Sequence, residues 1–168
     1  MKPEAYQKQL ILYLNNKCHG QAYDLAKQYI NEHPDDMVAH FLLGKSALWV
    51  EKYEEAAMEA RKAFNLARNE ADMVMCAIHA CIAYYRLQEY VKGFELLKTL
   101  ERIRTCEETE QLAFLFSLAI GNDEEARRHF DSMMNIDSDA AMGFLQEVAE
   151  GAQIDYEKLF RRTDRITY

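Results

Sequence analysis

The sequence predicts an all-α protein built from antiparallel helix hairpins. The 168 residues include only 6 Gly and 2 Pro, which leaves little material for the tight turns between β-strands. Apolar residues recur at helical spacing through most of the chain. Between Phe41 and Ala67, two such segments are separated only by the short turn Glu51-Lys52, as expected for two helices folded against each other.

Small side chains mark the faces on which these two helices meet. Gly44 and Ala47 lie three residues apart in the first segment, and the second carries Ala56, Ala60 and Ala63 at helical spacing. Facing stripes of small side chains let two helix axes approach closely. Tyr53, at the turn, is placed to fill the end of the gap.

The same pattern occurs earlier in the chain. We expect helices from about Glu4 to Asn16 and from Gln21 to Asn31, and Pro3 suits a first helical turn. A shift of 34 residues aligns Ala22 with Ala56. The chain therefore starts with a hairpin of the same kind.

Two further hairpins follow. A shift of 37 residues puts Cys81 in the position of Gly44, and we assign the surplus residues to a loop at 68–72. A shift of 33 residues then puts Ala126 in the position of the small residue at 93. The turn at 121–123 supplies a glycine helix stop and an Asn N-cap.

The last part of the chain predicts two more helices. One runs from about Ser138 to Glu150 and the other from Asp155 to Arg162. Because Glu147 and Glu150 occupy positions that are small or apolar in the earlier hairpins, we interpret this pair as a polar capping segment.

A Leu-Gly pair at 43–44, followed by Tyr53, Ala56 and Ala60, resembles the tetratricopeptide repeat, a helix–turn–helix unit of about 34 residues. The resemblance covers roughly Glu4 to Ile136. It implies a right-handed α-α superhelix (a solenoid), formed by a single array over 1–168. The expected repeats are about 3–36, 37–70, 74–106 and 107–139, with capping helices at about 139–163. The family's tryptophan position is held by Tyr6, His40, Ala77 and Glu110.

The resemblance also implies a concave groove lined by the first helix of each hairpin. The groove positions carried over to this chain are mostly apolar: Ile11, Leu14, Phe41, Lys45, Leu48, Trp49, Met75, Ile78, Ile82, Tyr85, Arg86 and Leu115. An exposed apolar strip marks an interaction site and suits a helix or an extended peptide. Alternatively, these side chains pack between neighbouring helices, or the C-terminal helix covers them.

One specific partner is disfavoured by the same comparison. Family members that grip the C-terminal carboxylate of a heat-shock chaperone use Lys, Asn and Arg side chains in the groove. The corresponding positions here hold Gln7, Ile11, Leu42, Met75 and His79. We therefore expect no carboxylate clamp.

Charge and composition exclude several other classes of partner. The net charge of −8 makes nucleic acid and anionic membrane surfaces unlikely as general partners. The longest N-terminal apolar run, at 10–14, is too short for a signal sequence, and no stretch approaches a membrane span. The 4 cysteines have no motif spacing, so we expect reduced thiols and a cytoplasmic protein.

No catalytic residues, metal site or cofactor are expected. Cys76, His79 and Cys81 form the densest metal-type cluster, but Cys81 points away from the other two on a helix. Cys18 and His19 lie at a turn with no carboxylate placed to orient them. The sequence also contains no phosphate-binding loop, HExxH or GxSxG motif.

These observations predict a non-enzymatic protein–protein interaction module. Its function would be to bind a peptide or helix of another protein in the apolar groove, as an adaptor or in a chaperone-like role. The alternative is a self-assembling structural protein, which forms a homodimer or a higher oligomer through the groove or through the open C-terminal end.

Overall fold

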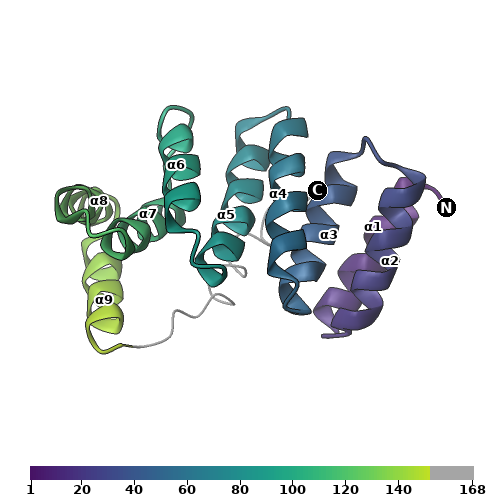
Figure 1. The fold of residues 1–168 in the computed structure, drawn as a ribbon, viewed down its shortest axis with the longest axis horizontal. Helices are drawn as coiled ribbons and strands as arrows, with labels where there is room; N and C mark the ends of the chain where they lie inside the picture. Colours follow the sequence, from purple (N-terminus) through teal and green to yellow (C-terminus); the bar gives the residue numbers. More distant parts are fainter. Residues whose placement is uncertain (152–168) are drawn as a thin grey trace. The chain divides into compact units, whose positions relative to one another are not determined.

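The computed structural model describes residues 1–151, which are helical and contain no strand (Figure 1). This confirms the all-α fold class. Within that range the helices are α1 Pro3–Asn15, α2 His19–Glu32, α3 Met37–Trp49, α4 Tyr53–Leu66, α5 Glu70–Arg86, α6 Tyr90–Glu101, α7 Glu107–Ala119, α8 Asp123–Ile136 and α9 Ser138–Ala149. None of these helices is both long enough and apolar enough to cross a membrane. The capping helix expected at 155–162 lies outside the described residues.

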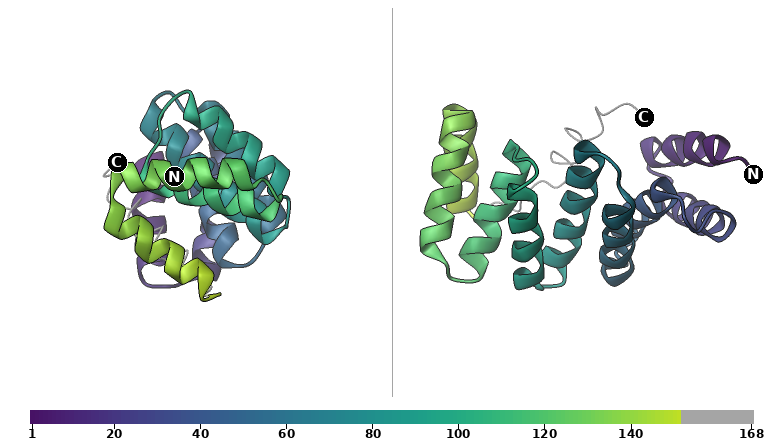
Figure 2. Two further views of the ribbon diagram at one scale, coloured as in Figure 1. Left: turned by 90° about the vertical axis from the view of Figure 1, so that its left-hand side faces the viewer. Right: turned by 90° about the horizontal axis from the view of Figure 1, so that it is seen from above.

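The chain divides into two compact units, which are described separately. The first, Met1–Glu89, holds α1 to α5. In it, α3 contacts both α1 and α5, so the first helices of successive hairpins lie next to one another (Figure 2). Helix α2 packs against α1 and α3, and α4 packs against α3 and α5. We call the row formed by α1, α3 and α5 the inner row.

The second unit begins at Tyr90 and contains α6 to α9. Helix α7 packs against α6 and α8, and α9 packs against α8. The core of this unit includes the fully buried side chains of Leu100, Leu112, Phe116 and Met133. Each helix thus buries one face against its neighbours in sequence.

The turns inside the hairpins repeat one backbone motif. The second residue after the end of the first helix has a positive φ each time, namely 59° at Lys17, 61° at Glu51, 59° at Gln88 and 72° at Gly121. The N–H of the following residue donates to the carbonyl five residues earlier, at 2.9 Å in all four turns. This bond is the one that closes a helix in the Schellman motif. The motif recurs at the 34-, 37- and 33-residue shifts derived from the sequence.

The expected loop at 68–72 is correct for residues 68 and 69 and wrong for 70–72. Helix α5 begins at Glu70, and the Asn69 side chain caps it by accepting a hydrogen bond from the backbone N–H of Asp72 at 2.8 Å. The acidic side chains of Glu70 and Asp72 suit the first helical turn because of the helix dipole. Helix α5 has 17 residues against the 13 of α3, so the surplus lengthens the helix instead of the loop before it.

The small-residue positions lie where helices approach closely. A Cβ added at Gly44 on α3 would lie 3.1 Å from the backbone nitrogen of Ala60 and 3.3 Å from the carbonyl oxygen of Ala56 on α4. In the second unit, a Cβ at Gly93 on α6 would lie 2.3 Å from the Phe116 ring on α7. Glycine allows backbone-to-backbone approach in the first case, and in the second it makes room for an aromatic ring.

Candidate functional site

Most of the residues predicted to line the groove lie on the three helices of the inner row, α1, α3 and α5, which lie side by side. Ile11 and Leu14 are on α1, the residues from Phe41 to Trp49 on α3, and those from Met75 to Arg86 on α5. Leu115 lies on α7 in the second unit. The binding role of these residues stays a prediction.

About half of the candidate residues are buried. Each of the following is at most 8% exposed: Phe41, Leu48, Met75, Ile78, Ile82 and Leu115. The open apolar strip expected from the sequence is therefore reduced at these positions. One physical reason is contact within the inner row, where the Phe41 ring of α3 packs edge-on against the His79 ring of α5, with ring centroids 4.7 Å apart.

The remaining candidates keep part of their surface exposed. Ile11 is 42% exposed and Arg86 is also exposed, while the partly exposed positions are Leu14, Lys45, Trp49 and Tyr85. Trp49 stacks on the His19 ring at the start of α2, with a centroid distance of 4.8 Å. The Arg86 guanidinium lies 5.8 Å from the Tyr53 ring centroid. These contacts orient two large side chains at the ends of α3 and α5.

The two cysteines and the one histidine of α5 are core residues. Burial raises the pKa of the Cys76 thiol to about 12 and lowers the pKa of His79 to about 3. The Nδ1 of His79 is 2.9 Å from the carbonyl oxygen of Met75. Within residues 1–151, these side chains and Cys81 do not form a group of three potential metal ligands. A thiol with a raised pKa is a poor nucleophile and a poor ligand at neutral pH.

Cys18 and His19, the other candidate pair in the sequence, point to different neighbours. The Cys18 thiol is directed at the carbonyl oxygen of Asn16, at 3.6 Å, whereas the His19 ring lies against Trp49. The described contacts therefore give no support to a thiol–imidazole pair.

Two buried histidine–carboxylate pairs were not expected from the sequence. His40 Nδ1 on α3 lies 2.5 Å from Glu59 Oε2 on α4. In the second unit, Glu110 Oε2 on α7 lies 2.7 Å from His129 Nδ1 on α8. In each pair the two residues are 19 positions apart in sequence. The histidine lies on the first helix of the hairpin in the first pair and on the second helix in the other. His40 and Glu110 occupy the family's tryptophan position, so a polar pair joins the two helices of the hairpin at that position in both units.

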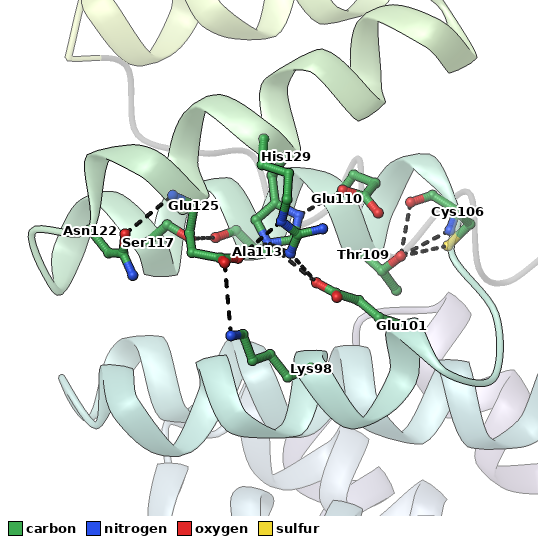
Figure 3. A network of polar contacts seen from close by, with 11 residues as sticks. Lys98, Glu101, Cys106, Thr109, Glu110, Ala113, Ser117, Asn122, Glu125 and His129 are labelled. Carbon is green, nitrogen blue, oxygen red and sulfur yellow. Dashed lines mark hydrogen bonds and ion pairs between the residues drawn. The ribbon is translucent and has the colours of Figure 1, made fainter.

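The second pair belongs to a larger network (Figure 3). His129 Nε2 lies 3.4 Å from Glu101 Oε1 on α6 and 3.6 Å from Glu125 Oε2 on α8. Arg128 Nη2 donates to both carboxylates at 2.7 Å. The sequence offered one signal for this cluster, because Glu125 and His129 are four residues apart on one helix face. Glu101 comes from another helix, and no local spacing indicates it.

Comparison with known proteins identifies relatives by structure only. Neither a protein-family model nor a curated protein matches the sequence. Among solved structures, a crystal structure of MamA protein superposes with a TM-score of 0.71 and 18% identity, over 83% of this chain and 75% of that chain. MamA 41-end from Desulfovibrio magneticus RS-1 superposes with a TM-score of 0.72 and 12% identity, over 97% of this chain and 93% of that chain. TTC0263, a thermophilic TPR protein of Thermus thermophilus, superposes with a TM-score of 0.69 and 15% identity, over 89% of this chain and 82% of that chain.

Identities this low show a shared fold and do not transfer a partner or an activity. The helical hairpins, their recurring turns and the match to a solved tetratricopeptide protein agree with one another. In fold, this chain is a tetratricopeptide-like repeat protein.

Proposed function

We propose that this protein is a non-enzymatic interaction module that binds a peptide or a helix of another protein along the inner row of its first unit. It would serve as an adaptor or chaperone-like factor, with the cytoplasm as its compartment. The observation that carries the proposal is a set of aromatic and cationic side chains on α3 and α5 that are partly exposed (Lys45, Trp49 and Tyr85) or exposed (Arg86).

These residue types are suited to the anchoring of a ligand. Trp, Tyr and Arg are enriched among the side chains that dominate the energetics of protein interfaces. Helix α5 also carries buried apolar side chains, such as Ile78 and Ile82, which anchor it in the core and make it a rigid base. A rigid base lowers the entropy cost of binding, because fewer groups become ordered when the ligand arrives.

Charge narrows the class of ligand. The whole chain carries −8, yet Lys45 and Arg86 place two cations on the inner row. A ligand with acidic side chains beside apolar ones would meet both cations and contact Trp49 and Tyr85. We therefore propose an amphipathic helix or an extended segment with acidic residues as the ligand.

Affinity capture from the source cell with a charge-reversed variant tests this function. Lys45→Glu/Arg86→Glu reverses the proposed contacts. Arg68→Glu/Arg127→Glu makes the same charge change at two positions outside the inner row. We expect a partner that is captured by the wild type and by the control variant and is lost from the inner-row variant. Equal capture by all three proteins would refute the inner row as the binding surface.

Self-assembly is separated from partner binding by light scattering of the purified protein over a range of concentrations. An adaptor keeps a constant mass as the concentration rises. The self-assembling alternative predicts a mass that rises with concentration in the wild type. It also predicts that the inner-row variant keeps the mass of a monomer.

A further inference from the structure

We propose that the second unit contains a binding site for a divalent transition metal of the Zn²⁺ class, formed by Glu101, Glu125 and His129. One ligand atom from each of these side chains lies within 4.8 Å of the other two (Figure 3). The residues come from α6 and α8, so an ion bound by all three would join two helices that flank α7. This site is independent of the proposed partner-binding surface on the first unit.

The spacing of the donor atoms fits a small tetrahedral ion. Zinc bonds to nitrogen and oxygen of about 2.0–2.1 Å imply ligand-to-ligand distances of roughly 3.3–3.4 Å in a tetrahedron. The His129 Nε2 atom lies 3.4 Å from the nearest oxygen of Glu101 and 3.6 Å from that of Glu125. The two carboxylate oxygens lie within 4.8 Å of each other. Side-chain rotations that bring them closer together would place three donors around one ion, with a fourth position left for water.

The histidine is held in the tautomer that a metal requires. Arg128 Nη2 lies 3.2 Å from His129 Nε2, but its two hydrogens are directed to the carboxylates of Glu101 and Glu125. The ring is oriented instead by Glu110, whose carboxylate can only accept a hydrogen bond. The ring proton then sits on Nδ1 and is donated to Glu110 Oε2 at 2.7 Å. Metal-binding histidines commonly donate their other N–H to a carboxylate in this way. The His129 and Glu110 side chains are 1% and 4% exposed, so the orientation of the ring is fixed by the core.

A cationic nitrogen already occupies the middle of the cluster. Arg128 Nη2 lies 2.7 Å from Glu101 Oε1 and from Glu125 Oε2. The Arg128 side chain is 49% exposed, so its head group has a path to solvent. The imidazole is buried and stays in place when the guanidinium leaves, so a divalent ion held by it and by the two carboxylates would replace one positive charge with two. Lys98 remains nearby, with its Nζ 3.8 Å from Glu125 Oε1.

The donor set selects among metals. One imidazole nitrogen and two carboxylate oxygens suit Zn²⁺, Co²⁺ and related ions, whereas Mg²⁺ and Ca²⁺ prefer oxygen ligands alone. Binding must weaken in acid, because protons compete for the imidazole and the carboxylates. Bound metal would also stabilise the second unit against unfolding, since the ligands are close together only in the folded state.

Titration of the full chain with ZnCl₂ and, separately, with CoCl₂ tests the site after removal of metals with a chelator. Isothermal titration calorimetry gives stoichiometry and affinity, and the visible absorption of Co²⁺ reports its ligands. We expect one ion per chain. Glu101→Gln/Glu125→Gln is expected to weaken binding at least tenfold, and Arg128→Gln to tighten it because the competing cation is gone. Glu124→Gln is the matched control, since it removes one exposed carboxylate of α8 without touching the cluster.

Circular dichroism of each variant establishes that the helices are intact. Failure of both the wild type and Arg128→Gln to bind either ion would overturn the proposal. Equal affinities for the double variant and the Glu124→Gln control would do the same. A Co²⁺ spectrum with thiolate charge-transfer bands would place the ion on a cysteine and would also refute this site.

Discussion

His40 and Glu59 form a buried pair across the α3–α4 hairpin, with 2.5 Å between Nδ1 and Oε2. The other ring nitrogen, Nε2, is 2.8 Å from the carbonyl oxygen of Pro34. Since both nitrogens face acceptors, the ring makes both contacts as a donor only when it is the doubly protonated imidazolium. Lys62 donates to the second oxygen of Glu59 at 2.9 Å. The carboxylate is thus satisfied on both sides.

This pair makes the stability of the protein depend on pH. The hydrogen bond that His40 donates to the Glu59 carboxylate raises the pKa of His40 above its ordinary value, against the opposing effect of burial. The contribution of the imidazolium is therefore complete below pH about 6.5 and is lost as the pH rises through the raised pKa. Burial raises the pKa of Glu59, but the hydrogen bonds from His40 and Lys62 outweigh it and hold the pKa low. The contribution of the Glu59 carboxylate to stability is lost only as the pH falls through its lowered pKa.

We therefore expect Glu59→Gln to destabilise the protein more at pH 6 than at pH 9. Glutamine accepts the same hydrogen bond but carries no charge, so the difference from the wild type isolates the ion pair. The change with pH is at most about 1.4 kcal/mol per pH unit, because one proton is involved. Urea unfolding of both proteins at the two pH values measures it.

His79 also makes stability depend on pH, and the comparison of Glu59→Gln with the wild type removes this second effect. Burial lowers its pKa to about 3, so the folded state loses stability as the pH falls from about 6.5 towards 3. This slope is present in both proteins and cancels in the difference. A destabilisation by Glu59→Gln that is the same at pH 6 and pH 9 would show that His40 is uncharged in the folded protein.

The succession of helix hairpins could be predicted from the sequence because the turns and the small residues recur along the chain. The residue that adopts positive φ recurs after 34, 37 and 33 residues, and the glycines at 44 and 93 lie where two helices meet. The start of α5 could not be derived from an alignment, because shifting one repeat on another cannot tell a longer loop from a longer helix. Local capping by Asn69 decides that boundary.

A second prediction concerns the backbone of these turns. Gly121 has a φ of 72° and no atoms near its missing Cβ, so Gly121→Ala is expected to cost roughly 1–2 kcal/mol of unfolding free energy through backbone strain alone. Glu51 has the same conformation with a side chain, at φ 61°. Glu51→Gly is expected to change stability by less than about 1 kcal/mol, because relief of strain is offset by greater freedom of the unfolded chain. Equal losses in both variants, measured by urea unfolding, would contradict this account of the turns.

The site was harder to derive from the sequence than the fold. Groove positions transferred by repeat alignment identify the correct helices but not their exposure. Phe41 is buried because His79 of the next inner helix lies against it, and that contact depends on how two hairpins pack. The Glu101 cluster was missed for a similar reason, since α6 and α8 come together only in the folded second unit.

A third prediction separates the cysteines by accessibility. Cys76 and Cys81 are fully buried, and burial raises the pKa of both thiols. Cys18 is partly exposed at the start of α2. We expect N-ethylmaleimide at pH about 7.5 to label Cys18, whose thiol is the nucleophile once ionised, while Cys76 and Cys81 stay unmodified until urea unfolds the chain. Peptide mass spectrometry measures the labelling. Labelling of the two buried thiols at the rate of Cys18 would mean that α5 opens readily.

The last prediction tests the close approach of α3 and α4. A methyl group at position 44 would lie 3.1 Å from the Ala60 backbone nitrogen, and that backbone is held inside α4. Gly44→Ala is therefore expected to push the two helices apart and to lower the unfolding free energy by about 1–3 kcal/mol, even though alanine favours a helix. Gly20, on α2, has no atoms within 4 Å of the added Cβ. Gly20→Ala is expected to stabilise the protein by about 0.4–1 kcal/mol, because it restricts only the unfolded chain. Chemical unfolding of both variants gives opposite signs if helix contact at Gly44 holds the hairpin together, and two stabilised proteins would show that the hairpin tolerates a wider spacing.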